Sequence, residues 1–217
     1  MPKLPIFPLN TVLFPGYELP LRIFEQRYKT MLADCLNLDG RFVIALISDG
    51  VEVGGDAIPR EIATVARINN AGDLDDEVIP ITTIGDHRVR ILELDRSLPY
   101  LSGDVEIIPE PTDEHIDPAL LKRAQTATER FARVMLMQLR GEWRANPQIP
   151  SDPALLGYKM GTLLADQPTA AQRVLEAESI NGRLRQAAPA IEALAAQFEA
   201  RLMEQAAADH RRGMHRN

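Results

Sequence analysis

The sequence predicts an α+β protein: a β-rich domain that curls into a small barrel with one inserted helix, followed by a C-terminal helical bundle domain. Short runs of β-branched residues, separated by Gly, Asp and Pro, fill the chain up to about residue 110, and Ala, Leu, Gln, Glu and Arg dominate after it. The polar segment 109–114, with two prolines, marks the change. We therefore expect domains at 1–112 and 116–208, and a disordered tail at 209–217, which has little apolar surface to bury.

Apolar segments predict the strands of the β-rich domain. The most informative segment is 87–95, where Val89 and Ile91 occupy odd positions and Leu92 and Leu94 occupy even ones. An apolar face that changes sides within one strand requires a bulge or a strong bend, and such bends allow strands to close into a barrel. The other expected strands lie at 42–48, 62–68, 78–84 and 105–108.

One helix is predicted inside the β-rich domain. Apolar residues recur at steps of three and four over 23–36, which gives that helix one apolar face. Two later helices begin with the same signal, an aspartate at the N-cap followed by proline at the first helical position. These pairs are Asp117-Pro118 and Asp152-Pro153.

Two more helices are expected towards the C-terminus. Thr169 and Gln172 have the spacing of a capping box and predict the start of a short helix. The last helix carries an apolar seam over 184–202 whose steps alternate between four and three, as in a heptad repeat. Pro189 lies inside this seam, and we expect it to kink the helix.

The charge balance and the single cysteine limit the classes of function. The net charge is −7, and arginine supplies most of the positive charge, since only four lysines occur. A protein that neutralises nucleic-acid phosphates usually has the opposite balance, so nucleic acid is disfavoured as a partner. No apolar run approaches the roughly 18 residues of a membrane span, and the N-terminus lacks the apolar core of a signal peptide. Because Cys35 is the only cysteine, no intrachain disulfide can form, and we expect a cytoplasmic protein without membrane contact.

Several motifs that would indicate an enzyme are missing from the sequence. No glycine precedes a lysine, so there is no phosphate-binding loop of the G-x-x-x-x-G-K-[ST] type. No serine sits in a G-x-S-x-G elbow, and no H-E-x-x-H motif occurs. His87 on a predicted strand is interpreted as a structural or surface residue, since a metal site needs three or four converging donors. We therefore expect no catalytic residues, no metal site and no cofactor.

The first thirty residues carry a specific pattern. The segment 4–16 (LPIFPLNTVLFPG) leads into 19–28 (LPLRIFEQRY). This pattern resembles the opening of the substrate-binding N-terminal domain family of Lon proteases. The resemblance covers about residues 4 to 185 and departs from the family at Ala63, where the family usually has glycine. It continues in the segments 52–55 (EVGG), 64–68 (TVARI), 85–91 (GDHRVRI), 99–101 (PYL), 150–153 (PSDP) and 183–184 (RL).

The resemblance implies a PUA-like barrel and a stand-alone member of the family, without the ATPase module or the Ser-Lys peptidase module of full-length Lon proteases. It also implies a non-catalytic module that binds unfolded or tagged polypeptides, as an adaptor in protein quality control with a protease or chaperone as a further partner. Two alternatives stay open. A PUA-like fold can bind RNA, and a site between the two domains could serve an enzyme of unknown type.

Four aromatic residues are candidates for a polypeptide-binding surface, because recognition of an unfolded chain needs exposed apolar surface. Phe14 and Tyr17 flank the Pro15-Gly16 turn, and Tyr100 and Trp143 lie at predicted element ends, where binding residues tend to be found. The alternative for Phe14 and Tyr100 is that they close the ends of the barrel. For the helix residues Phe24, Arg27 and Tyr28, core packing and an ion pair are favoured over a ligand role.

Overall fold

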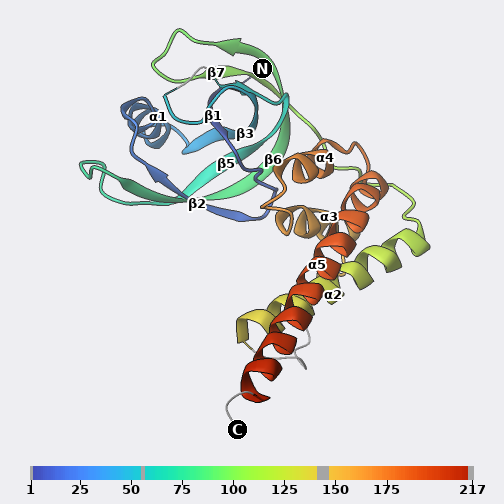
Figure 1. Ribbon diagram of the computed structural model, residues 1–217. Coiled ribbons are helices and arrows are strands. Elements are labelled where there is room, and N and C mark those ends of the chain that lie inside the picture. Colours follow the sequence, from blue (N-terminus) through green and yellow to red (C-terminus); the bar gives the residue numbers. More distant parts are fainter. Residues whose placement is uncertain (1, 55–56, 141–146, 215–217) are drawn as a thin grey trace. The chain divides into compact units, whose positions relative to one another are not determined.

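The computed structural model describes residues 2–54, 57–140 and 147–214, and their contacts divide the chain into two compact units (Figure 1). The first unit comprises Met1–Thr112 and Ala165–Glu176, and the second comprises Asp113–Leu164 and Ala177–Asn217. The break after Thr112 coincides with the end of the predicted β-rich domain. The segment Ala165–Glu176, which we expected in the helical domain, instead joins the first unit.

A seven-stranded sheet forms the first unit, and its strands follow the order β1-β7-β6-β5-β3-β4. Strand β1 pairs with β7 on one side and, in parallel, with β3 on the other, so the sheet closes on itself as the predicted barrel (Figure 1). Strand β2 lies off this ring and pairs with β6. The strands are β1 (Lys3–Leu9), β2 (Glu18–Ile23), β3 (Arg41–Asp49), β4 (Ile58–Pro59), β5 (Ile62–Ala71), β6 (Ile79–Asp95) and β7 (Ser102–Ile107).

Strand β6 is much longer than predicted, because the two segments expected as separate strands join into one of 17 residues. The bulge predicted from the change of apolar face is present, since the register between β6 and β7 shifts between Ile91 and Glu93. Near its middle, the backbone of Gly85 pairs with the turn at residues 14–17: Gly16 N donates to Gly85 O (2.8 Å) and Gly85 N donates to Tyr17 O (2.9 Å). Gly16 has a φ of 80°, as the Pro-Gly turn requires.

The barrel strands bury both of their faces. Side chains alternate between the faces of a strand, so Ile6 and Val43 join one buried cluster while their neighbours Phe7 and Phe42 join the other. Helix α1 (Gln26–Leu36) contributes Tyr28 and three other buried residues to the second cluster. The helix therefore covers one face of the curled sheet, as the apolar stripe predicted.

Helix α4 (Pro168–Glu176) is fastened to the barrel by buried polar groups. The amide of Gln172 donates to the carbonyl of Ile62 (2.8 Å), and Nη1 of Arg88 donates to the carbonyl of Leu175 (2.9 Å). Gln172 is thus a contact to strand β5, and its amide also reaches Glu176 within the helix (2.9 Å). The predicted capping box of Thr169 and Gln172 is wrong, because the side-chain amide of Gln172 donates to strand β5 and to Glu176 and does not return to the start of the helix.

The second unit contains α2 (Pro118–Arg140), α3 (Pro153–Thr162) and α5 (Ile180–Met214). Both predicted N-caps are formed: the carboxylate of Asp117 accepts from Ala119 N (2.9 Å), and that of Asp152 accepts from Leu155 N (2.8 Å). The helix α5 contains Pro189 and continues through Met214, into the segment predicted as a disordered tail; residues 215–217 lie outside the described residues.

Helices α2 and α5 pack side by side along the apolar seam. Two ion pairs, Arg123–Glu192 and Arg130–Glu199, bridge the helices, and the Phe131 ring meets the Phe198 ring edge-on with centroids 5.8 Å apart. Among the described helices, none combines the length and the apolar character that crossing a membrane requires.

The thiol of Cys35 should be unreactive in the folded protein. Burial raises the pKa of its thiol from 9.0 to about 12, and Asp34 and Asp39 add to the shift. Thiolate is the reactive form, so a thiol reagent at pH 8 should label Cys35 only after unfolding. Above pH 9 the unfolded chain loses this proton while the folded chain keeps it, so stability should fall as the pH rises from 9 towards 12. Urea titrations compared with Cys35→Ala, which removes this proton, will measure the effect; a pH-independent difference between the two would contradict it.

Candidate functional site

The residues before helix α1 hold a neighbouring loop in place. Glu25 is the N-cap residue of α1, yet its carboxylate makes no bond to the helix end. Its Oε2 accepts instead from Nε of Arg27 (3.1 Å) and from the backbone N of Gly54 (3.1 Å). Arg27 also donates through Nη2 to the carbonyl of Glu52 (3.3 Å), and its guanidinium carbon lies 4.4 Å from the centroid of the Tyr28 ring. The loop after β3 is therefore fixed to the first turn of α1.

The end of strand β1 joins the same network. The carboxylate of Glu52 accepts from the backbone N of Asn10 (3.0 Å) and from its side-chain amide (2.8 Å). Three segments that are distant in the sequence, after β1, before α1 and after β3, thus meet through charge-assisted hydrogen bonds, which are stronger than neutral ones. The sequence predicted an ion pair here without naming the partner, and the structure pairs Arg27 with Glu25, with 3.0 Å between Nη2 and Oε2.

An apolar pocket of about 170 Å³ opens beside this network, and we call it the Phe24 pocket. Phe24 is 52% exposed and Val53 is 58% exposed, although both are apolar. Exposed apolar side chains gathered around a hollow are typical of a binding surface, whereas single exposed residues are ordinary. The pocket is lined by Phe7, Leu9, Pro20, Leu21, Arg22, Ile23, Phe24, Glu25, Tyr28, Glu52 and Val53.

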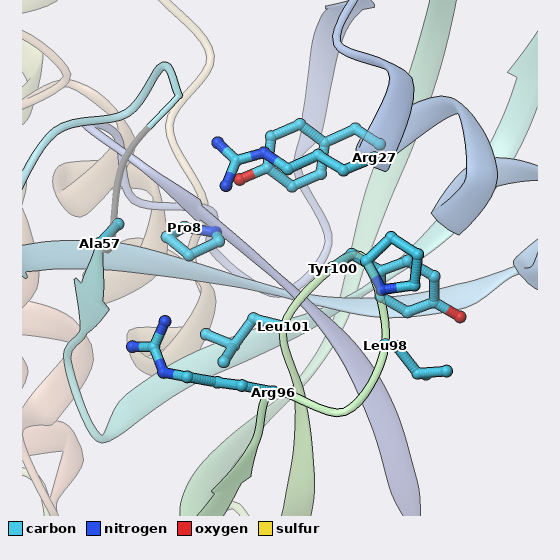
Figure 2. A pocket seen from close by; sticks show the side chains of 9 residues that line it. Pro8, Arg27, Ala57, Arg96, Leu98, Tyr100 and Leu101 are labelled. Atoms are coloured by element: carbon cyan, nitrogen blue, oxygen red, sulfur yellow. The ribbon is translucent and has the colours of Figure 1, made fainter.

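A second pocket, of about 210 Å³, contains two arginines, and we call it the arginine pocket (Figure 2). Figure 2 shows Arg27 and Arg96 on opposite sides of Pro8, with their guanidinium groups at the same end of the pocket. Tyr28 lines both pockets, so the two pockets are neighbours. The other residues that line the arginine pocket are Ala57, Leu98, Pro99, Tyr100 and Leu101.

Of the four aromatic residues predicted from the sequence, the three that the structure describes do not line one common pocket. Phe14 is fully buried, and Tyr17 is half-buried, with its pKa raised by that burial. Neither of these two is among the residues that line the pockets. Tyr100 lines the arginine pocket, but its ring is buried and its hydroxyl donates to the carboxylate of Asp34 (2.7 Å). Burial raises the pKa of the phenol, and the hydrogen bond to Asp34 adds to the shift. Trp143 lies outside the described residues.

Only some of the pocket residues could be recognised from the sequence. The apolar stripe placed Phe24 on the buried face of a helix, but α1 begins at Gln26, so Phe24 precedes the helix and points away from the core. Glu25 could have indicated where the helix starts, because carboxylates favour helix N-termini. Arg96 follows a strand with no pattern around it, and nothing in the sequence pairs it with Arg27.

Over the part of the chain that the structure describes, no cluster of three or more His, Cys, Asp or Glu residues could hold a metal ion.

Known proteins share much of this sequence. The family of the ATP-dependent protease La (LON) substrate-binding domain matches residues 3–192. Lon protease 2 of Myxococcus xanthus is 32% identical over 113 residues, which are 50% of this chain and 13% of that protein. Lon protease 2 of Herpetosiphon aurantiacus is 25% identical over 169 residues, or 76% of this chain and 19% of that protein. The matched part of the chain thus spans less than a fifth of each of these curated relatives.

Solved structures show the same fold. A Lon N-terminal domain protein from Xanthomonas campestris superposes with a TM-score of 0.65 at 26% identity, over 86% of this chain and 96% of that chain. The N-terminal domain of Mycobacterium avium complex Lon protease has a TM-score of 0.63 at 16% identity, over 90% of this chain and 98% of that chain. The family match extends from β1 into helix α5, which confirms the resemblance expected over about residues 4 to 185. This chain therefore belongs to the Lon substrate-binding domain family.

Proposed function

We propose that this protein binds exposed apolar segments of polypeptides, without catalysis, and that the Phe24 pocket receives an apolar side chain. The observation that carries the proposal is the half-exposed Phe24 ring beside an apolar hollow of about 170 Å³. Membership of a substrate-binding domain family supports a protein as the ligand. The segments FEQRY and EVGG, which carry the family resemblance, supply Phe24, Tyr28 and Val53 to this pocket.

The size of the pocket suits weak and general recognition. Burying one leucine-sized side chain contributes about 2 kcal/mol, which by itself gives only weak binding. An unfolded chain offers many such side chains, so repeated contacts can hold it, whereas a folded protein hides them. This selectivity fits an adaptor in cytoplasmic protein quality control, which presents unfolded or tagged chains to a protease or chaperone.

Replacing Phe24 by serine should weaken the binding of a permanently unfolded model protein at least about tenfold, because it removes a large, half-exposed apolar side chain from the lining of the pocket. Fluorescence anisotropy with the labelled unfolded protein measures the dissociation constant. The melting temperature should stay close to that of the wild type, since the ring is half exposed and contributes little to the core.

Two variants make this test specific. Leu38→Ser removes a side chain that is 81% exposed just beyond α1 and outside the pocket, so it should bind like the wild type. Tyr17→Ala tests the surface that the sequence predicted. Wild-type affinity in Phe24→Ser would refute the placement of the site, and a loss in Tyr17→Ala would move the site to the turn at residues 14–17.

A further inference from the structure

We propose that the arginine pocket is a carboxylate-binding subsite, which takes a carboxylate of the bound polypeptide next to the apolar side chain held in the Phe24 pocket. The carboxylate comes from the C-terminus of the polypeptide or from an aspartate or glutamate side chain. The link to a polypeptide rests on the proposed function. The chemistry of the pocket stands on its own lining residues.

Two guanidinium groups supply the donors for an anion. Arg27 and Arg96 enter the pocket from opposite sides of Pro8, and no acidic residue is among the nine described residues that line it (Figure 2). A guanidinium presents a planar row of N–H donors that matches the two oxygens of a carboxylate. Proline and leucine side chains form much of the remaining wall, which lowers the local dielectric constant and strengthens such a bond.

The first of these arginines is held ready for binding. Arg27 is fixed by the carboxylate of Glu25, by the carbonyl of Glu52 and by the ring of Tyr28, so little side-chain entropy remains to be lost. Arg96 lies in a turn after β6, where the carboxylate of Asp95 accepts from the backbone N of Ser97 (2.7 Å). This turn fixes the backbone of Arg96, and its side chain is exposed to solvent.

The charge of the site favours a carboxylate over a phosphate group. Arg27 is already paired with Glu25, which offsets part of the positive charge of the pocket. A carboxylate carries one negative charge, whereas a phosphomonoester carries about −1.5 to −2 at neutral pH. The net charge of −7 on the whole chain adds a further electrostatic penalty that grows with the charge of the ligand.

The position of the pocket defines the class of polypeptide. Because the buried Tyr28 lines both pockets, the two are neighbours, and one bound chain can place an apolar side chain in the Phe24 pocket and a carboxylate in the arginine pocket. Segments with both features close together should bind best. Neutral apolar segments should bind through the Phe24 pocket alone and more weakly.

Labelled peptides of one leucine-rich sequence test this inference in three forms: a free C-terminal carboxylate, a C-terminal carboxamide, and a carboxamide with one internal aspartate. At low salt, the best carboxylate form should bind the wild type about tenfold tighter than the neutral form. Comparing the two carboxylate forms identifies the source of the group. Arg96→Gln should reduce the advantage to about twofold or less while leaving the neutral peptide unaffected.

Arg41→Gln is the matched control, because it also removes one exposed positive charge, from an arginine that pairs with Asp39 away from the pocket. It should keep the full advantage of the carboxylate peptide. Equal binding of neutral and carboxylate peptides to the wild type, or an equal loss in Arg41→Gln, would overturn the inference. Displacement of the peptide by phenyl phosphate at lower concentrations than N-acetyl-leucine would overturn the choice of carboxylate.

A separate measurement keeps this inference distinct from the proposed function. N-acetyl-leucine is titrated against protein labelled with ¹⁵N-arginine, and the Nε–Hε resonances of Arg27 and Arg96 are followed by NMR. Saturable shifts in the wild type that Arg96→Gln abolishes support the pocket even if every peptide fails to bind, a result that would refute the proposed function alone. An absence of shifts in the wild type would refute the pocket.

Discussion

Replacing Arg88 by alanine should lower the free energy of unfolding by about 3 kcal/mol. The side chain is only 1% exposed, and its Nη1 donates to the carbonyl of Leu175 in helix α4. Its Nε also lies 3.4 Å from the carboxylate of Glu110. Alanine leaves a cavity in place of the long side chain, and it leaves the buried end of α4 without its hydrogen-bond donor. Urea denaturation measures the loss.

Two further variants separate the causes of this loss. Arg90→Ala removes the next arginine on the same strand, whose exposed ion pair with Glu61 contributes little, so the expected change is below about 0.5 kcal/mol. Arg88→Met fills most of the space but supplies no donor, and it should lie between the wild type and Arg88→Ala. Hydrogen exchange in α4 should accelerate in both Arg88 variants. A loss in Arg90→Ala as large as that in Arg88→Ala would show that Arg88 has no special structural role.

Gly85→Ala should be about as damaging, with an expected loss of about 3 kcal/mol, because the added methyl group would collide with backbone. A Cβ at this position would lie 2.3 Å from the carbonyl oxygen of Phe14 and 2.8 Å from its carbonyl carbon. The turn at residues 14–17 must then move away, and its two hydrogen bonds to Gly85 would be broken or stretched. Thermal and urea unfolding will measure the cost.

Gly16→Ala is the matched control in the same turn. Gly16 has a φ of 80°, but a Cβ there would meet nothing within 4 Å, so only the strained backbone conformation contributes a cost of about 1 kcal/mol. Gly85 has no positive φ, so the close approach of the two backbones alone should cause the loss in Gly85→Ala. A loss in Gly85→Ala no larger than that in Gly16→Ala would contradict the prediction.

Local signals predicted the parts of this fold that depend on local chemistry. The aspartate-proline pairs located the starts of two helices, because an N-cap and a proline at the first position act within a few residues. The change of apolar face along 87–95 predicted the bulge beside Ile91. In both cases the physical cause lies within one turn of helix or one strand.

Features that depend on contacts between distant segments could not be predicted from the sequence. The spacing of Thr169 and Gln172 predicted a short helix, but this local signal does not identify what the helix packs against. In the structure, α4 contacts the barrel through Gln172 and Arg88. The arginine pocket joins Arg27 to Arg96, which only the closure of the sheet brings together. The choice of aromatic residues for the binding surface had the same weakness, because Phe14 and Tyr100 satisfy the same pattern as exposed residues and yet are buried.

The ion pairs between α2 and α5 have a mechanical consequence. Arg123 bonds Glu192 and Arg130 bonds Glu199, each across 69 residues, so the two helices run in the same direction with a constant offset. If α5 is pulled along its axis while α2 is held, the force acts in shear. It then loads both ion pairs and the Phe131–Phe198 contact at the same time. An antiparallel hairpin pulled at its open end would instead lose such contacts one after another. A load on the far part of α5 should thus be carried along the whole helix pair, which slips as one unit once the load exceeds the combined strength of its contacts.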